Sequence, residues 1–150
     1  MASLERALTI ATEAHTGATD KGGAPYILHP LRLMLQFPPG DAQLVALLHD
    51  VVEDSDWTLD ALRNEGFSEE VISGVDGMTR RESESYEDFV LRCATNPLAR
   101  QVKLADIEDN MDIRRLGELG QKDLERLRRY QRAHHLLSAA GNTRNPRMLD

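Results

Sequence analysis

LLHDVVED, residues 47–54, is the stretch that decides how this sequence is interpreted. Its leucines and valines suit a buried helix, yet His49, Asp50, Glu53 and Asp54 stand among them. Burying ionisable groups costs free energy unless each group finds a partner. At about 100° per residue, these four side chains fall on one arc of a helix and the apolar side chains fall on the other. The stretch therefore predicts a helix with one face in the core and a polar cluster on its other face.

The polar cluster has no basic residue beside it, because residues 41–62 contain neither lysine nor arginine. Three carboxylates and a histidine in one patch repel one another unless a cation lies among them. A metal ion would supply that cation. A solvated helix end would also explain an acidic face, and the pattern alone leaves both interpretations open.

Two further stretches carry isolated polar residues in apolar surroundings. In PYILHP, residues 25–30, His29 precedes a proline, and the proline disfavours the α region for the backbone of His29. This predicts that His29 lies at a loop-to-helix junction, where it could be a ligand. In VKLADIEDNMD, residues 102–112, Asp106 lies within an apolar turn, where an aspartate is rarely buried alone. The alternatives are a histidine that caps a turn and an aspartate that pairs with nearby Lys103.

Length and composition indicate one soluble domain. A chain of 150 residues can bury one sizeable core. Its net charge of −7 argues against a nucleic-acid-binding surface. The single cysteine, Cys93, fits a reducing cytoplasm, and we expect neither a signal peptide nor a membrane span. We therefore expect neither nucleic acid nor a membrane as a partner, and the oligomeric state stays open.

Helix signals dominate the chain and strand signals are nearly absent. We expect about eight helices in one all-α bundle, followed by a loose polar tail at about residues 141–150. Ser3, Thr58, Ser68 and Ser85 are the expected N-caps of four helices, and Asp41 is the expected cap of the helix that carries LLHDVVED. The remaining helices are expected from Pro30 through Leu35, from Pro97 to about Asp112, and from about Lys122 to Ala140, with Gly141 as the stop.

Three stretches in this order resemble the HD-domain hydrolases of the RelA/SpoT type. They are AHTGATDKGGAPYILHP (14–30), LLHDVVED (47–54) and VKLADIEDN (102–110). The chain is most similar to the small stand-alone alarmone hydrolases, which remove the 3′-pyrophosphate of (p)ppGpp with Mn²⁺. The similarity runs from about residue 4 to about residue 137. On this resemblance we expect one hydrolase domain, without the synthetase and regulatory domains of the long enzymes.

The resemblance implies a role for each matching residue. It makes His29, His49, Asp50 and Asp106 the ligands of a single Mn²⁺, and it gives the water-activating role to Glu53 and Asp54. The remaining matches are expected to contact a phosphorylated nucleotide substrate: Lys21, Asn110, Arg126 and Tyr130. Two imidazoles and two carboxylates suit a divalent transition metal on chemical grounds as well.

The chain departs from the family at positions that contact the base and the phosphates of the substrate. Asp20 stands where the family has an arginine that packs on the guanine base, and residues 107–109 replace its Arg-Leu-His. Ile113 replaces a small hydroxyl residue. These changes predict weak discrimination between guanine and adenine.

Three functions are therefore compatible with the sequence. The first is Mn²⁺-dependent removal of the 3′-pyrophosphate of an alarmone. The second is phosphohydrolysis of another phosphorylated nucleotide or small metabolite on the same fold. The third is metal or nucleotide binding without catalysis, and the intact Glu53–Asp54 pair argues against it because a binder needs no water-activating pair.

Overall fold

The computed structural model describes residues 2–142, with side chains through residue 140, and this part of the chain is all-helical. The α-helices are α1 (Leu4–Ala14), α2 (Leu28–Met34), α3 (Asp41–Leu48), α4 (Val51–Asp54), α5 (Leu59–Asn64), α6 (Glu69–Met78), α7 (Tyr86–Ala94), α8 (Pro97–Asn110) and α9 (Gln121–Asn142). A short 3₁₀ helix, η1 (Ile113–Arg115), precedes α9. The predicted all-α fold is confirmed.

The four predicted serine and threonine caps are all present. The side chains of Ser3, Thr58, Ser68 and Ser85 each accept a hydrogen bond from the backbone N–H three residues later. Each bond satisfies one of the amides that a helix leaves unpaired at its start. Local side-chain chemistry thus sets the start of α1, α5, α6 and α7.

Two predictions about the central helix are wrong. Gly40 is its N-cap, and Asp41 is the first helical residue. At that position the negative charge of Asp41 still interacts favourably with the positive end of the helix dipole. The helix also breaks at residues 49–50 and restarts as α4. The ring of His49 bonds the carbonyl of Ala46 at 2.6 Å, and that carbonyl would accept the amide of Asp50 in a continuous helix. The imidazole therefore replaces a backbone partner at the break.

Two helix boundaries differ from the prediction for other reasons. His29 lies inside α2, as its second residue, rather than outside the α region. The first helical N–H groups have no intrahelical partner, so the proline that follows costs the helix no hydrogen bond. At the other end of the chain, α9 continues through residues 141 and 142, past the predicted stop. The rest of the predicted tail, residues 143–150, lies outside the described residues.

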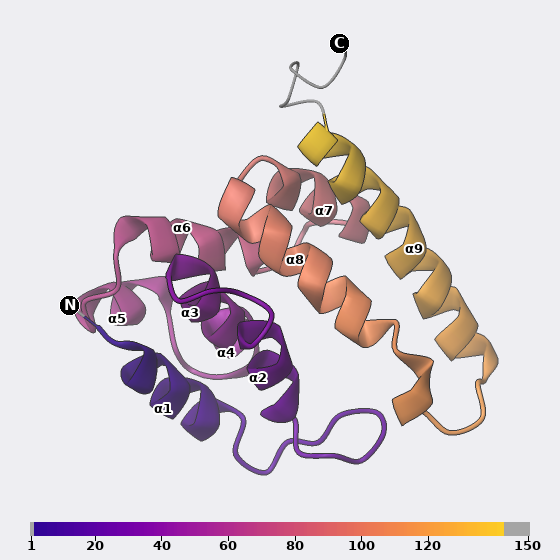
Figure 1. The fold of residues 1–150 in the computed structure, drawn as a ribbon, viewed down its shortest axis with the longest axis horizontal. Helices are drawn as coiled ribbons and strands as arrows, with labels where there is room; N and C mark the ends of the chain where they lie inside the picture. The colour runs from indigo at the N-terminus through magenta and orange to yellow at the C-terminus, as the bar shows by residue number, and fades with distance from the viewer. Residues whose placement is uncertain (1, 143–150) are drawn as a thin grey trace.

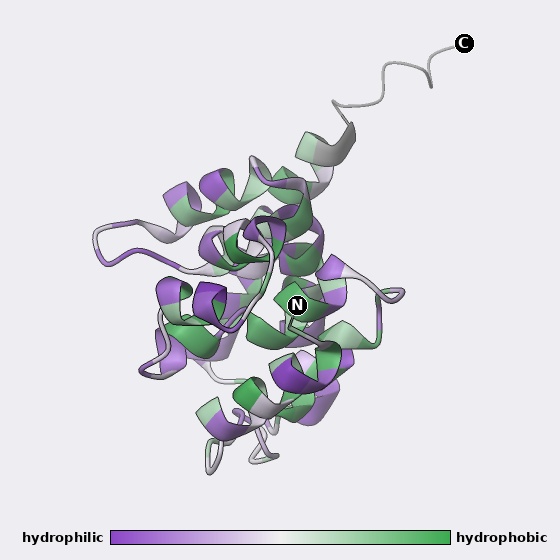
Figure 2. Ribbon diagram, turned by 90° about the vertical axis from the view of Figure 1, so that its left-hand side faces the viewer, coloured by the Kyte–Doolittle hydropathy of each residue, from purple (hydrophilic) through white to green (hydrophobic). Residues whose placement is uncertain are grey.

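Helix α8 separates two apolar clusters. The larger cluster joins α1 to α6 with one face of α8, through residues such as Ile10, Leu47 and Val102. The smaller cluster joins α7, α8 and α9 through Val90, Ile107 and other apolar side chains. In Figure 1, α8 runs between the early helices and α9, and Figure 2 shows apolar residues gathered inside and polar residues outside. Polar residues of α8 are thereby held at the centre of the molecule.

None of the helices within residues 2–142 has both the length and the apolar character that crossing a bilayer requires.

An ion pair joins the segment after α6 to α7. Arg92 donates to the Glu84 carboxylate at 2.7 and 3.0 Å, and the same guanidinium donates to the carbonyls of Asp76 and Thr79. The hydrogen bonds from Arg92 hold the pKa of Glu84 at about 2. Charge and geometry together make this pair a contributor to stability.

We expect Glu84→Gln to lower the melting temperature at pH 7 by roughly 3–6 °C, since charge-assisted bonds with partial solvent screening contribute about 1–2 kcal/mol. A carboxyl with a depressed pKa stabilises the fold above its unfolded pKa, here 4.5, and this contribution disappears as the pH falls towards 2. The difference from wild type should therefore shrink below pH 4.5. Thermal denaturation from pH 7 to pH 3 measures it, with exposed Glu82→Gln as control, and a constant difference would contradict the prediction.

Candidate metal centre and substrate pocket

The four predicted metal ligands lie together, at the meeting point of α2, the break before α4, and α8. Ligand atoms of His29, His49 and Asp50 all lie within 4.8 Å of one another. The Oδ1 atom of Asp106 lies 2.8 Å from His29 Nε2 and 3.5 Å from His49 Nε2. Residues 77 positions apart in the chain, His29 and Asp106, thus share one small space.

The chemistry of His49 fits a cation at this point. Its Nδ1 bonds the carbonyl of Ala46, whereas its buried Nε2 has no hydrogen-bond partner among the described residues. The Asp50 carboxylate lies only 3.0 Å from Nε2, but in an orientation that makes no hydrogen bond. A ring nitrogen that faces carboxylates without bonding them is arranged as a metal ligand would be.

Each histidine is surrounded by negative charge. Burial alone would lower the pKa of both imidazoles, but the carboxylates of Asp106 and Asp109 raise the pKa of His29. The carboxylates of Asp50 and Asp106 likewise raise the pKa of His49 well above its usual value. The carboxylates therefore stabilise a positive charge on or beside each ring, and a proton or a metal ion can supply that charge.

Asp106 uses its two oxygens differently. Its Oδ2 accepts a 2.8 Å bond from Lys103, while its Oδ1 faces both histidines and accepts a 3.2 Å bond from Asn110. The Lys103 charge, the bond with His29 and the charge of His49 outweigh burial and hold the pKa of Asp106 well below its usual range. The pairing with Lys103 that the sequence offered as an alternative is present, and it leaves Oδ1 available to a metal.

Asp109 is a part of the site that the sequence interpretation missed. It accepts a 2.6 Å bond from His29 Nδ1 and two bonds from Arg32 at 2.8 and 2.9 Å, and Arg115 lies 3.3 Å away. These bonds outweigh burial and lower the pKa of the Asp109 carboxyl. A carboxylate on Nδ1 fixes the ring so that Nε2 points towards the cluster. The available signal was its position one helical turn after Asp106.

Tyr26 was also missed. Its hydroxyl donates to Asp50 Oδ2, and its ring lies between those of His15 and His29, with centroid separations of 4.8 and 5.7 Å. Despite burial, the charge of His49 lowers the pKa of Asp50 to about 2. Asp50 is therefore an oriented, ionised carboxylate.

Glu53 and Asp54 occupy the last turn of α4, and both side chains reach solvent. Partial desolvation, together with the nearby Asp50 carboxylate, raises the pKa of each. The Glu53 carboxylate accepts a hydrogen bond from the backbone N–H of Arg80. A raised pKa brings a carboxylate closer to the range that suits a general base.

A pocket of about 320 Å³ brings together all four residues predicted to contact substrate: Lys21, Asn110, Arg126 and Tyr130. Tyr26 and Arg115 also line it. The pocket adjoins the candidate metal centre, because Tyr26 bonds Asp50 and Asn110 bonds Asp106. Arg126 reaches the pocket while paired with Asp123. The pocket thus combines cationic and aromatic side chains beside the metal cluster.

Asp20 builds the loop on which Lys21 is carried. Its Oδ1 accepts backbone hydrogen bonds from Gly22 and Ala24, each at 2.9 Å. The same loop lies against η1, since a Cβ on Gly22 would lie 2.4 Å from the carbonyl oxygen of Arg115. Asp20 therefore shapes the pocket wall through the backbone.

We expect Gly22→Ala to raise the KM of the best nucleotide substrate about tenfold or more, because the added methyl group must push the loop away from η1. Metal affinity should stay at the wild-type value, since the metal cluster lies on other elements. Steady-state kinetics and calorimetry measure the two quantities. Gly117→Ala is the matched control, as its Cβ would meet open space. Equal KM values for the two variants would contradict the expectation.

Comparison with known proteins shows a consistent set of relatives, although no family model matches the chain. This chain is 33% identical over 120 residues to a guanosine-3′,5′-bis(diphosphate) 3′-pyrophosphohydrolase of Aquifex aeolicus. The alignment covers 72% of this chain and 17% of the relative. A GTP pyrophosphokinase of Streptomyces coelicolor is 36% identical over 121 residues, 72% of this chain and 14% of the relative. The chain thus spans less than a fifth of the length of these relatives.

The fold has a counterpart among solved structures. A structure described as a metazoan ortholog of SpoT that hydrolyses ppGpp matches with a TM-score of 0.67 and 20% identity. The match covers 95% of both chains, so the two proteins share their fold. Sequence and fold together place this chain among the HD domains of the RelA/SpoT type.

Proposed function

We propose that this protein is a Mn²⁺-dependent hydrolase that removes the 3′-pyrophosphate of ppGpp-type nucleotides. The observation that carries the proposal is the direct contact between the metal cluster and the pocket of Lys21, Asn110, Arg126 and Tyr130. Relatives that are about one third identical over the aligned residues carry hydrolase names of this kind. Site geometry and similarity thus support the same chemistry.

The proposed metal ligands are His29, His49, Asp50 and Asp106. When bound, the ion would neutralise phosphate charge and make the attacking water more acidic. Asp109 and Tyr26 act as positioning residues, because the first holds His29 by Nδ1 and the second donates to Asp50.

Glu53 and Asp54 are the proposed proton acceptors for the attacking water. The water adds to the phosphorus and its proton passes to a carboxylate. The bond to the 3′-oxygen breaks, so pyrophosphate is released and the 3′-oxygen takes up a proton to become a hydroxyl group. Glu53 is held by the Arg80 amide, whereas no hydrogen bond to the Asp54 carboxylate is present among the described residues. This difference favours Asp54 as the acceptor and Glu53 as the residue that orients the water.

Local cations are needed to bind the substrate, because the chain is acidic overall, at −7. Lys21, Arg115 and Arg126 line the pocket and supply three of them. The aromatic rings of Tyr26 and Tyr130 offer surfaces against which a base or sugar can pack. A polyanionic nucleotide matches this lining better than a neutral metabolite.

A second candidate function rests on Asp20. This carboxylate lines the pocket, cannot stack on a base as a cation would, and is committed to the loop backbone. A cation over a base contributes about 0.5–2 kcal/mol, so its absence weakens base selection roughly 2- to 30-fold. Another phosphorylated nucleotide could therefore be the substrate on the same machinery.

Comparison of phosphate and pyrophosphate release tests the proposal. With Mn²⁺ present, ppGpp and ppApp should both release pyrophosphate, with kcat/KM values within about 30-fold of each other. GTP and GDP, which lack a 3′-pyrophosphate, should remain intact. Turnover of GTP alone would support the second candidate. Metal binding without turnover of any nucleotide would leave only a non-catalytic binder.

A further inference from the structure

A second cavity, of about 660 Å³, lies between α7 and α9 and shares no lining residue with the substrate pocket. Its apolar wall includes Val90, Ala133 and Leu136. Leu136 is 40% exposed, so part of this apolar surface faces solvent. A cavity of this size with an apolar wall is within the usual range of small-molecule sites.

Two arginines give one end of the cavity a positive charge. Within the part of the chain that the structure describes, Arg129 and Arg132 have no carboxylate partner within 4.0 Å. The contrast with Arg115 and Arg126 of the substrate pocket is clear, because both of those are paired with aspartates. The chain has seven more acidic than basic groups, yet the lining of this cavity includes two guanidinium groups and one carboxylate, that of Glu87.

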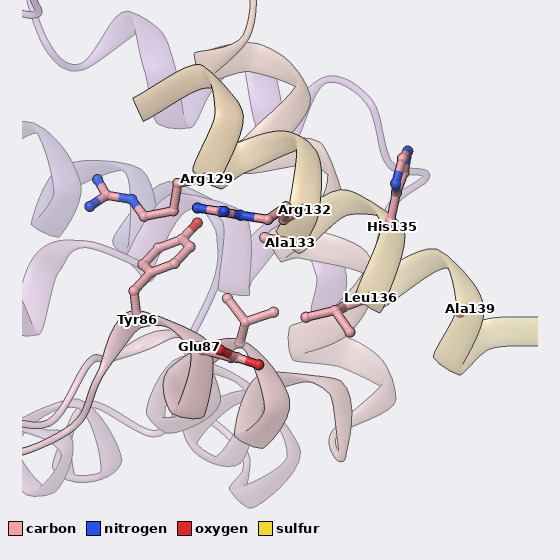
Figure 3. A pocket seen from close by; sticks show the side chains of 9 residues that line it. Tyr86, Glu87, Arg129, Arg132, Ala133, His135, Leu136 and Ala139 are labelled. Atoms are coloured by element: carbon pink, nitrogen blue, oxygen red, sulfur yellow. The ribbon is translucent and has the colours of Figure 1, made fainter. Parts of the chain in front are cut away.

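The hydroxyl group of Tyr86 lies at the same end of the cavity. It is buried, and it has no hydrogen-bond partner among the described residues. The guanidinium of Arg129 lies 4.8 Å from the centre of the Tyr86 ring. Figure 3 shows the hydroxyl and both guanidinium groups gathered at one end, with Leu136 and Ala139 towards the other. A buried hydroxyl without a partner is a donor that a ligand can satisfy.

We propose that this cavity binds a small organic anion with an apolar body. Its sulfonate, phosphate or carboxylate end would accept bonds from Arg129, Arg132 and the Tyr86 hydroxyl. Its apolar body would lie along Val90 and Leu136. The two ends of the cavity thus match a ligand that has both a negative charge and an apolar surface. An inorganic anion has no apolar surface, and a neutral hydrocarbon has no charge.

Calorimetric titration of the full chain with naphthalene-1-sulfonate tests the site. We expect one binding event that sulfate and 1-naphthol reproduce only with at least tenfold weaker affinity. Arg132→Gln should weaken the sulfonate about tenfold or more, because a charge-assisted bond is lost. Tyr86→Phe should weaken it with little change in packing. Melting temperatures of the variants show that each remains folded.

Two control variants locate the binding event. Arg128→Gln changes an exposed arginine of α9 outside this cavity, and Arg126→Gln changes an arginine of the substrate pocket. Both should bind the sulfonate as the wild type does. The proposal is overturned if the sulfonate does not bind, if 1-naphthol binds equally well, or if Arg132→Gln binds as tightly as Arg128→Gln. The test uses no nucleotide or metal, so its outcome is independent of the proposed hydrolysis.

Discussion

His49→Ala should bind Mn²⁺ at least ~100-fold more weakly than the wild type, because it removes a ligand atom that nothing else in the buried cluster replaces. The wild-type chain should bind about one ion. Elemental analysis after dialysis and calorimetry measure the stoichiometry and the affinity. His134→Ala is the control, since His134 lies outside the cluster and bonds Glu108 on the surface. Undiminished binding by His49→Ala would remove this histidine from the metal centre.

A graded series around the same ion makes the test sharper. Asp106→Asn keeps the size of a ligand but loses its charge, so it should resemble His49→Ala. Asp109→Ala should weaken binding by only about 10- to 100-fold, as loss of an orienting carboxylate does. Asp112→Asn removes a neighbouring carboxylate that pairs with Arg115 but does not contact His29, and it should leave metal affinity unchanged. A smaller loss in Asp106→Asn than in Asp109→Ala would contradict the assigned roles.

The double variant Glu53→Gln with Asp54→Asn should lower kcat by about 10²- to 10⁴-fold while Mn²⁺ binding and the melting temperature stay close to wild type. The amides keep the shape of the carboxylates but cannot accept the proton of the attacking water. Asp56→Asn, an exposed neutralisation two residues further on, is the control.

The two single variants divide the roles. If Asp54 accepts the proton, Asp54→Asn alone should cause most of the loss in kcat. Glu53→Gln should then have the smaller effect, because its amide can still accept the hydrogen bond from Arg80. Wild-type kcat in the double variant would exclude both residues from water activation.

The sequence predicted the helices well where the signal was local. A hydroxyl that accepts a bond from the amide three residues later stabilises the start of a helix, and this local pattern predicted the caps at Ser3, Thr58, Ser68 and Ser85. The grouping of His29, His49, Asp50 and Asp106 was also predictable. Their roles as metal ligands remain a prediction.

Features that depend on contacts between distant residues were not predictable from periodicity. The helix break at residues 49–50 arises from a side-chain bond to a carbonyl, which a count of 100° per residue cannot show. Asp109 contacts His29, and Tyr26 contacts Asp50, only because the fold brings these distant parts of the chain together. Asp20 was interpreted as a missing cation, whereas the fold also gives it two backbone amides to hold.

The most direct test of the central claim is chromatography of ppGpp after incubation with purified protein and Mn²⁺. We predict that ppGpp yields GDP and pyrophosphate in equal amounts, that chelation of the metal stops the reaction, and that His49→Ala forms neither product. Intact ppGpp after incubation with metal-loaded wild-type protein, or release of single phosphates in place of pyrophosphate, would contradict the account.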